Sequence, residues 1–512
     1  MKAMKRISLS LAAGLVGVSS AQAADLPVKA KAIEYVKGCS LYGPGFYYIP
    51  GTDTCIKLGG YLRTEVSVNS SYHYDVPNNS VGGARNRLSD AYNWRSREEM
   101  TIDTRTASEY GTVRTFFEGV FQWTGGAYSG AGNGSTVYAS LGGVSAPNNA
   151  NPGAVAGGTV GVWNAFIQFA GFTIGKAMSQ FTTPWAHYPA NVLDGLPGAS
   201  SWDPVNQFSY TADFGQGISL SVSAQDSVIH DTTAIWNVSA ASAAGILAGS
   251  YGGNDIAGSA SPDFVGMLRV DQSWGLFQAS VAAHDNHAAY YGATELTGHP
   301  SDKWGWAGQL ALSIKNLPTG PGDSVNMSGV YSHGASRYSF HDYGSSTFAM
   351  YGGSGLPGVY QSLGFAGVSD AVFVAGSGME LTTTYGFQGG YTHNWNAYWN
   401  TGIFGGWAAV RYNGTAKGYM CSAVVANLAL SSGMAGCNPD FSYSVVGINT
   451  RWTPVKNLTF TTELAYAMLD QKYASGSSVT APLQAGIAKP AGTYEIKDQS
   501  AISLLFRAQR NW

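Results

Sequence analysis

Residues 56–66 read Ile56-Lys57-Leu58-Gly59-Gly60-Tyr61-Leu62-Arg63-Thr64-Glu65-Val66, and apolar and polar side chains alternate along them. In a β-strand, successive side chains point to opposite faces. As a strand, this segment carries Ile56, Leu58, Leu62 and Val66 on one face and Lys57, Tyr61, Arg63 and Glu65 on the other. The alternation therefore predicts a strand with one apolar face and one polar, charged face.

The same alternation recurs along the chain as far as the C-terminal Trp512. Between residues 218 and 224, for example, Ile218, Leu220, Val222 and Ala224 are interleaved with serines. We predict sixteen strands, near residues 56–66, 99–105, 113–123, 160–171, 172–180, 206–213, 217–225, 263–271, 275–284, 303–316, 323–333, 381–394, 397–412, 441–453, 457–470 and 497–512.

The connections between these strands alternate strictly between short and long. Short ones include 213–217, 272–275, 394–397 and 453–457, whereas long ones run near 67–94, 124–159, 181–205, 226–262, 285–302, 334–380, 413–440 and 471–496. Outer-membrane barrels have tight periplasmic turns and long extracellular loops, and an even strand number puts both barrel ends on the periplasmic side. The sequence thus predicts an all-β fold, a transmembrane antiparallel β-barrel of sixteen strands.

Alternation alone does not distinguish a membrane barrel from a soluble barrel or sandwich, in which the apolar face points inward. Aromatic residues at the strand ends favour lipid, because such residues gather at membrane interfaces. They are Trp123, Trp274, Trp395, Trp399, Trp452 and Trp512. After Ala24 there is no uncharged apolar run of 18 residues, so the membrane would be crossed by strands.

The N-terminus has the pattern of an export signal. Lys2, Lys5 and Arg6 precede a short apolar core, and Ala21-Gln22-Ala23 offers small residues for cleavage. The core is too short for a membrane anchor, which needs about 20 apolar residues. We expect residues 1–23 to be a cleaved signal peptide, residues 24–53 an N-terminal periplasmic segment and residues 54–512 the barrel. Loss of the three basic residues would lower the formal net charge from −3 to −6, so no nucleic-acid partner is predicted.

Four cysteines fit an oxidising compartment. Cys39 and Cys55 lie 16 residues apart, as do Cys421 and Cys437, so pairing within each couple is the simplest of three possible connectivities. Metal sites need tighter spacings with nearby histidines. His284 and His287 flank Asp285-Asn286, which indicates a solvated turn, and Gly353–Gly358 matches a dinucleotide fingerprint without the helix that it requires. We therefore predict no metal and no cofactor.

Three segments resemble the alphaproteobacterial general porins: residues 39–63 (CSLYGPGFYYIPGTDTCIKLGGYLR), residues 165–176 (AFIQFAGFTIGK) and residues 506–512 (FRAQRNW). The resemblance implies a sixteen-stranded homotrimer in outer-membrane lipid and lipopolysaccharide, whose third extracellular loop folds into the lumen and narrows it. It implies also that Trp512 is a terminal signal for the barrel-assembly machinery. The loop at 334–380 is longer than the family suggests, which leaves the ligand preference open.

The chemistry of such a channel would lie in charged groups that face a water-filled constriction. Strand parity places these in the lumen: Lys57, Arg63, Glu65, Arg97, Asp103, Arg105, Arg114 and Glu118. The third long connection adds Asp194 and Asp203. We hypothesise a transverse field between Arg63, Arg105 and Arg114 and the loop acids. The alternative is that several of these groups pair locally, as Arg–acid ladders between adjacent strands.

These features favour passive diffusion of small hydrophilic solutes and ions, and no enzyme activity. A substrate-preferring porin is the alternative. A barrel protease or lipase needs a clustered acid, base and nucleophile, and an active transporter needs a plug domain for which residues 24–53 are too few. A secreted soluble β-protein that binds carbohydrate would share the strand pattern but would be soluble without detergent.

Overall fold

The computed structural model describes residues 37–69, 83–89, 91–124, 154–155, 158–200, 202–227, 233–340 and 348–512. The expected signal peptide, residues 1–23, lies outside the described residues, as does the first part of the expected periplasmic segment.

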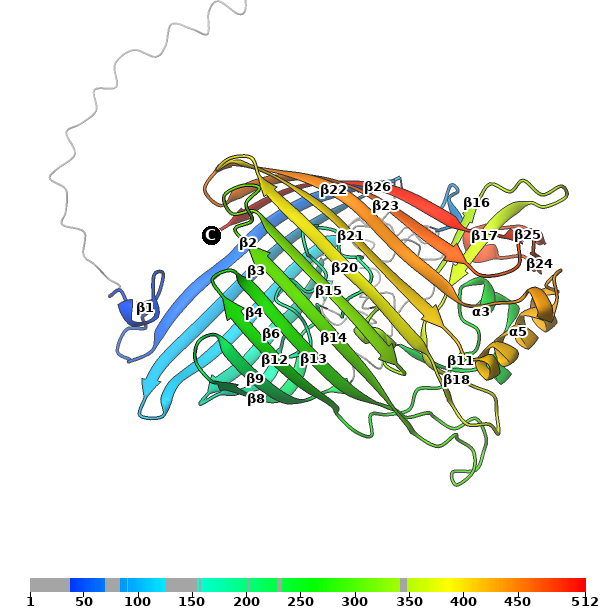
Figure 1. Cartoon of the computed structure of the whole chain (residues 1–512), viewed down its shortest axis with the longest axis horizontal. Coiled ribbons are helices and arrows are strands. Elements are labelled where there is room, and N and C mark those ends of the chain that lie inside the picture. Colours follow the sequence, from blue (N-terminus) through cyan, green and yellow to red (C-terminus); the bar gives the residue numbers. More distant parts are fainter. Residues whose placement is uncertain are drawn as a thin grey trace, which may run out of the picture.

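Sixteen antiparallel strands form a closed barrel (Figure 1). Each strand pairs with the next along the chain, and the last, β26, pairs with the first, β2, to close the ring. Closure pairs the edge N–H and C=O groups that lipid cannot satisfy. The strands are β2 (Cys55–Val68), β3 (Tyr92–Ser108), β4 (Gly111–Thr124), β6 (Gly158–Phe169), β7 (Phe172–Ala177), β8 (Val205–Asp213), β9 (Ile218–Gln225), β12 (Asp263–Gln272), β13 (Gly275–Asn286), β14 (Lys303–Lys315), β15 (Ser324–His333), β20 (Thr383–Asn394), β21 (Trp399–Arg411), β22 (Phe441–Val455), β23 (Leu458–Gln471) and β26 (Gln499–Asn511).

The predicted strand number and the alternation of short and long connections are confirmed. The largest differences lie at β3, which begins seven residues earlier than the predicted 99–105, and at β7, which ends at Ala177 rather than at residue 180. β7 is short because its pairing with β8 stops at Ala177, after which the chain leaves the barrel wall. Two short strands, β1 (Tyr47–Tyr48) and β5 (Ala154–Val155), extend the sheet at β2 and β6.

The barrel exposes its apolar side chains and buries its polar ones. On β9, Val222 is 57% exposed, whereas the neighbouring Ser221 is 0% exposed. On β13, Val281 is exposed, and Gln278 and Ser280 are buried. This polarity is the reverse of that in a soluble fold and is the arrangement of a lipid-facing barrel with a polar interior. Among the described residues, no helix is both long and apolar enough to cross a membrane.

A disulfide between Cys39 and Cys55 ties the N-terminal segment to the start of β2. The loop that it closes contains a single 3-10 turn, η1 (Ser40–Tyr42), and the β1 strand. This loop lies at the end of the barrel that carries the short turns (Figure 1). The predicted pairing of Cys39 with Cys55 is confirmed, as is that of Cys421 with Cys437.

At the opposite end, described parts of the connections after β9, β15, β21 and β23 form a layer, here called the cap (Figure 1). One small sheet joins β11 (Gly253–Asn254), β10 (Ala234–Asn237), β18 (Ser369–Phe373) and β19 (Glu380–Leu381). A second joins β16 (Phe348–Gly352), β17 (Gln361–Ala366), β25 (Gly492–Ile496) and β24 (Ser478–Ala481). The cap helices are α3 (Ala243–Leu247) and α5 (Gly414–Leu428), with 3-10 turns η4 (Val238–Ala240), η5 (Ser336–Tyr338), η6 (Met434–Gly436) and η7 (Ala485–Ile487).

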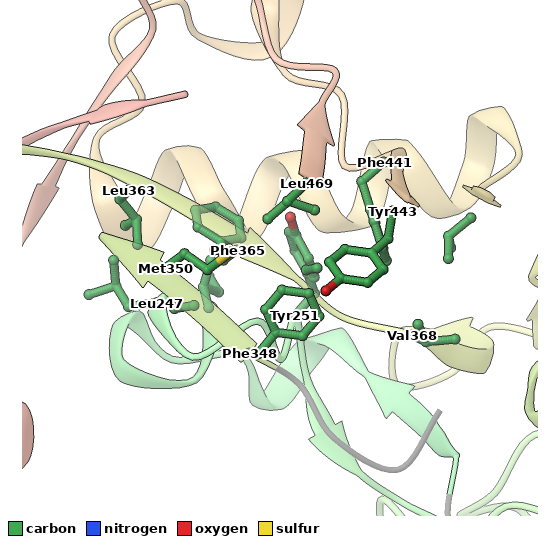
Figure 2. Packing of buried hydrophobic residues seen from close by; sticks show 14 of the residues in the cluster. Leu247, Tyr251, Phe348, Met350, Leu363, Phe365, Val368, Phe441, Tyr443 and Leu469 are labelled. Atoms are coloured by element: carbon green, nitrogen blue, oxygen red, sulfur yellow. The ribbon is translucent and has the colours of Figure 1, made fainter. Parts of the chain in front are cut away.

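The cap shares a hydrophobic core with the ends of the barrel strands (Figure 2). Tyr251 comes from the connection between β9 and β12, and Phe348, Met350 and Leu363 come from the connection between β15 and β20. Leu469 of β23 and residues of β21 and β22 belong to the same cluster. The second disulfide, Cys421–Cys437, links α5 to η6 beside this core. We predicted these stretches only as long loops, so the cap is a feature that the alternation pattern missed.

Candidate functional site

The chain between β7 and β8, residues 178–204, is here called the inner segment. Its backbone carbonyls accept hydrogen bonds from amide side chains of distant strands. Gln309 Nε2 on β14 donates to Phe181 O at 2.8 Å, and Asn326 Nδ2 on β15 donates to Pro189 O at 2.9 Å. Further donors are Gln278 on β13, to Phe181 O; Gln388 on β20, to Ala186 O; and Asn449 on β22, to Ala190 O.

Glycines on β20 and β21 let the inner segment approach the wall closely. A Cβ at Gly390 would lie 2.6 Å from Ala190 Cβ, and one at Gly402 would lie 2.7 Å from Ala190 O. Both distances are shorter than real side-chain contacts, so any larger residue at these positions would push the segment away. The segment is thus positioned by side chains and gaps of the barrel strands.

On the β26–β2–β3 wall, Glu65 lies between two arginines. In strand register Glu65 is opposite Arg507 on one side and Arg95 on the other, and each guanidinium donates its Nε–H to one Glu65 carboxylate oxygen. Arg507 Nη2 also donates to Val192 O of the inner segment at 3.1 Å. All three side chains are nearly inaccessible to solvent, and the Glu65 carboxylate offsets one of the two guanidinium charges within the wall.

Asp194 connects the inner segment to this group. Its Oδ2 accepts from Arg95 Nη1 at 2.8 Å, and its Oδ1 accepts from the Tyr188 hydroxyl at 3.0 Å. Burial tends to raise the pKa of Asp194, but the nearby guanidiniums of Arg95, Arg97 and Arg507 outweigh it and hold this pKa well below its usual range. Asp194 is therefore ionised at neutral pH.

One step along the same wall is a second row of four residues in register: Gln509, Arg63, Arg97 and Gln122, on β26, β2, β3 and β4. Gln509 Oε1 accepts from Arg63 Nε at 2.8 Å, and Gln122 Oε1 accepts from Arg97 Nε at 2.7 Å. The two arginines are direct cross-strand neighbours. We call this set the Gln–Arg–Arg–Gln row.

These residues line a cavity of about 860 Å³. Of the predicted pore residues, the cavity walls contain five: Arg63, Arg97, Glu118, Asp194 and Asp203. Arg95, Arg451 and Arg507 also line it and were missed. The signal was present in the sequence, because Arg95 shares the strand parity of Arg97 and Arg507 shares that of Gln509. Asp203 pairs with Arg337 of η5, at 3.2 Å.

Three predicted residues form a separate cluster near the short turns. Arg105 Nη2 and Arg114 Nη2 lie 2.9 and 3.0 Å from Asp103 Oδ2. The arginines line a second cavity, of about 510 Å³, together with Tyr42. The Arg114–Asp103 pair joins adjacent strands, as in the local ladder that we considered as the alternative, whereas Arg105 and Asp103 lie on the same strand. Lys57 lies apart from both cavities, with its Nζ 5.8 Å from the centre of the Phe46 ring.

Comparison with known proteins identifies the family. The family model described as "Porin subfamily" matches residues 25–505. The chain belongs to the porin subfamily. Porin Omp2b of Brucella suis biovar 1 (strain 1330) is 29% identical to this porin over 287 residues, which are 55% of this chain and 66% of the relative, just under two thirds of its length. Porin Omp2b of Brucella melitensis biotype 1 gives the same values.

Among solved structures, the outer-membrane channel DcaP of Acinetobacter baumannii is similar to this porin with a TM-score of 0.56. Its sequence is 14% identical, and the match covers 91% of this chain and 99% of that one, which supports the fold. The porin is thus an outer-membrane β-barrel, and its family indicates a channel rather than an enzyme.

One expectation for the porin is wrong. His284 does not lie in a solvated turn but is buried at the end of β13. Its Nδ1 lies 2.7 Å from Asp263 Oδ1, and the Tyr338 hydroxyl donates to Asp263 Oδ2 at 2.7 Å. β13 extends two residues beyond the predicted 275–284, and the cap covers this end of the strand. His284 is therefore buried although its neighbours in the sequence are polar.

Proposed function

We propose that the chain forms a water-filled channel for passive diffusion of small hydrophilic solutes and ions across the outer membrane. The observation that supports this most is the cavity of about 860 Å³, which is lined by charged side chains of the barrel wall and by the inner segment. We infer that the inner segment lies in the lumen and forms the constriction, because its anchors come from β13, β14, β15, β20, β22 and β26.

The charges around this cavity support a transverse field. Arg63, Arg97, Arg451 and Arg507 lie on an arc of wall from β22 to β3, and Asp194 and Asp203 lie on the inner segment. A field between such groups orients polar solutes and disfavours apolar ones. Arg105 and Arg114, which we first placed in this field, face the second cavity and belong in the proposal to the periplasmic mouth.

Planar-bilayer recording of the purified protein tests the channel. We expect discrete current steps whose size grows with KCl concentration, because ions cross a wide aqueous path. The folded state is checked in parallel from the shift of the band in unheated gels. Folded protein that gives no current steps would exclude a channel.

A substrate-preferring porin is the second candidate, and the cap favours it. A cap packed through a shared core on the barrel end that carries the long connections restricts how solutes approach the cavity more than separate flexible loops would (Figure 1). Swelling rates of liposomes with uncharged sugars of increasing size distinguish the two. A smooth decline with size supports general diffusion, and a single favoured solute supports a preference.

The remaining expectations also stand as proposals. The protein would be a homotrimer in contact with lipopolysaccharide, inserted by the barrel-assembly machinery, and its mature chain would start at Ala24 after loss of residues 1–23. Residues 24–53 would be periplasmic. N-terminal sequencing of the membrane form tests the cleavage site, and cross-linking in native membranes tests the trimer.

A further inference from the structure

Two successive rows on one wall differ in whether a carboxylate stands between their arginines. In the first row, Glu65 stands between Arg507 and Arg95, and each of its two carboxylate oxygens accepts from one guanidinium. In the Gln–Arg–Arg–Gln row, Arg63 and Arg97 are adjacent with no carboxylate between them. Among the described residues, neither of these guanidiniums has an acidic partner at ion-pair distance. Arg63 donates to Gln509, and Arg97 donates to Gln122 and to the Tyr61 hydroxyl.

An Arg–Arg cross-strand pair is unfavourable on its own, because like charges directly opposite one another repel. The glutamines hold it in place. Each takes the Nε–H of its arginine, so terminal Nη–H groups remain for another acceptor even though Arg97 also donates to the Tyr61 hydroxyl. Arg63 is held further by the Tyr61 ring, whose centre lies 4.5 Å from its Cζ. Arg63 and Arg97 start from directly opposite positions on neighbouring strands, whose backbones lie about 5 Å apart, so one oxyanion group can accept from both guanidiniums.

We propose that Arg63 and Arg97 bind the carboxylate group of permeating solutes. The solute carboxylate would accept from two arginines, as Glu65 does in the neighbouring row. The inference rests on the proposed channel function and adds a solute class to it. Both arginines line the cavity, so a solute in the channel reaches them. The hydrogen bonds would be charge-assisted, and these are stronger than neutral ones.

The acidic residues of the same cavity restrict which carboxylate-bearing solutes would bind to the two arginines. Glu99 and Glu118 lie beside the row, and Asp194 and Asp203 lie on the inner segment. Asp194 and Asp203 are paired with Arg95 and Arg337, so Glu99 and Glu118 are the acids that would repel a second negative group of a solute. A monocarboxylate or a zwitterion would place its one carboxylate on the arginines and its neutral or cationic part toward these two acids. We therefore assign the site to monocarboxylates and zwitterions.

The test compares Arg63→Gln and Arg97→Gln with Arg269→Gln. Arg269 on β12 is a matched control, because its Nε and Nη2 donate to a glutamine, Gln278, at 3.0 and 2.8 Å, and it does not line the cavity. Each variant loses one positive charge and one Arg–Gln pair. The measurement is the permeability ratio of acetate to potassium, from the reversal potential in a potassium acetate gradient, with KCl conductance recorded on the same channels.

We expect Arg63→Gln and Arg97→Gln each to lower the acetate permeability ratio roughly threefold, the effect of one charge-assisted contact in a hydrated site. Arg269→Gln should leave it nearly unchanged, and Arg63→Lys should restore part of it. Unchanged acetate permeability with normal KCl conductance would overturn the site and leave the channel intact. An equal loss in Arg269→Gln would overturn it too, because the effect would then be one of overall charge. Absence of KCl conductance in the wild type would instead overturn the proposed function.

Discussion

Single carboxylates organise the charged wall of this porin. Glu65 joins β26, β2 and β3 through two guanidiniums, and Asp194 attaches the inner segment to one of them, Arg95. A buried carboxylate between two arginines adds little net stability when complete, but its removal leaves uncompensated charges. The stability of this wall therefore depends more on Glu65 and Asp194 than on the total number of ion pairs.

Replacing Glu65 by Gln tests this dependence. The variant keeps the side-chain shape and leaves Arg95 and Arg507 without their shared counter-charge, so we expect a loss of about 3–5 kcal/mol in stability. The measurement is the temperature at which the folded band in unheated gels converts to the unfolded one. Thr64→Ala, an exposed position on the same strand, should leave that temperature unchanged. Equal behaviour of the two variants would contradict the assignment.

The depressed pKa of Asp194 predicts a pH dependence. Because its pKa in the folded protein lies below the ordinary value of about 4, the attachment to Arg95 is fully present at neutral pH and is lost only as the pH falls toward the folded pKa. The difference in single-channel conductance between the wild type and Asp194→Asn should therefore be as large at pH 4 as at pH 7, and should vanish in stronger acid. A difference that is already halved at pH 4 would show an ordinary pKa.

At the scale of elements, alternation predicted the strands, whereas the inward course of the inner segment was expected only from the resemblance to the general porins. Alternation such as Ile218-Ser219-Leu220-Ser221 needs only local sequence, and each strand of the barrel obeys it. The anchors of the inner segment are glutamines and asparagines on separate strands. In the sequence they do not differ from other polar residues of the same strand face, and only the register of the strands shows that they contact one segment. Parity identified lumen charges such as Arg63 and Arg97 but could not say which of them share a cavity.

Two adjacent glycines on β20 test how the inner segment is positioned against the barrel wall. A Cβ at Gly390 would overlap Ala190, whereas a Cβ at Gly389 would make ordinary contacts, the nearest being 3.5 Å from Asn326 O. Gly390→Ala should therefore displace the inner segment, alter the single-channel conductance and cost about 1–3 kcal/mol through overpacking. Gly389→Ala should behave as the wild type in both measurements. A normal conductance in Gly390→Ala would show that the segment does not depend on this gap.

The whole molecule consists of two layers with different origins in the sequence. The barrel forms from strands that are neighbours in the chain, but the cap sheets join connections that are far apart. β17 pairs in parallel with β25, so that Gln361 lies opposite Tyr494, and β10 pairs in parallel with β18. Strands of four to six residues with non-local partners carry too little periodicity to be recognised. This is why residues 334–380 were predicted only as a long loop.

Since the cap and the barrel share one hydrophobic core, a cavity in that core should destabilise both. Leu363, on β17, is 0% exposed within this core, and its truncation to Ala should cost about 2–5 kcal/mol. Leu483, also in the cap, is 67% exposed, and Leu483→Ala should cost almost nothing. We expect Leu363→Ala to speed proteolytic cleavage between residues 348 and 380 by a factor of roughly 30 or more, since 2 kcal/mol changes the open population by that amount. Because the same cluster includes residues of β21, β22 and β23, the temperature at which the barrel unfolds in gels should fall as well. Loss of cap protection with an unchanged unfolding temperature would show that the two layers unfold separately despite the shared core.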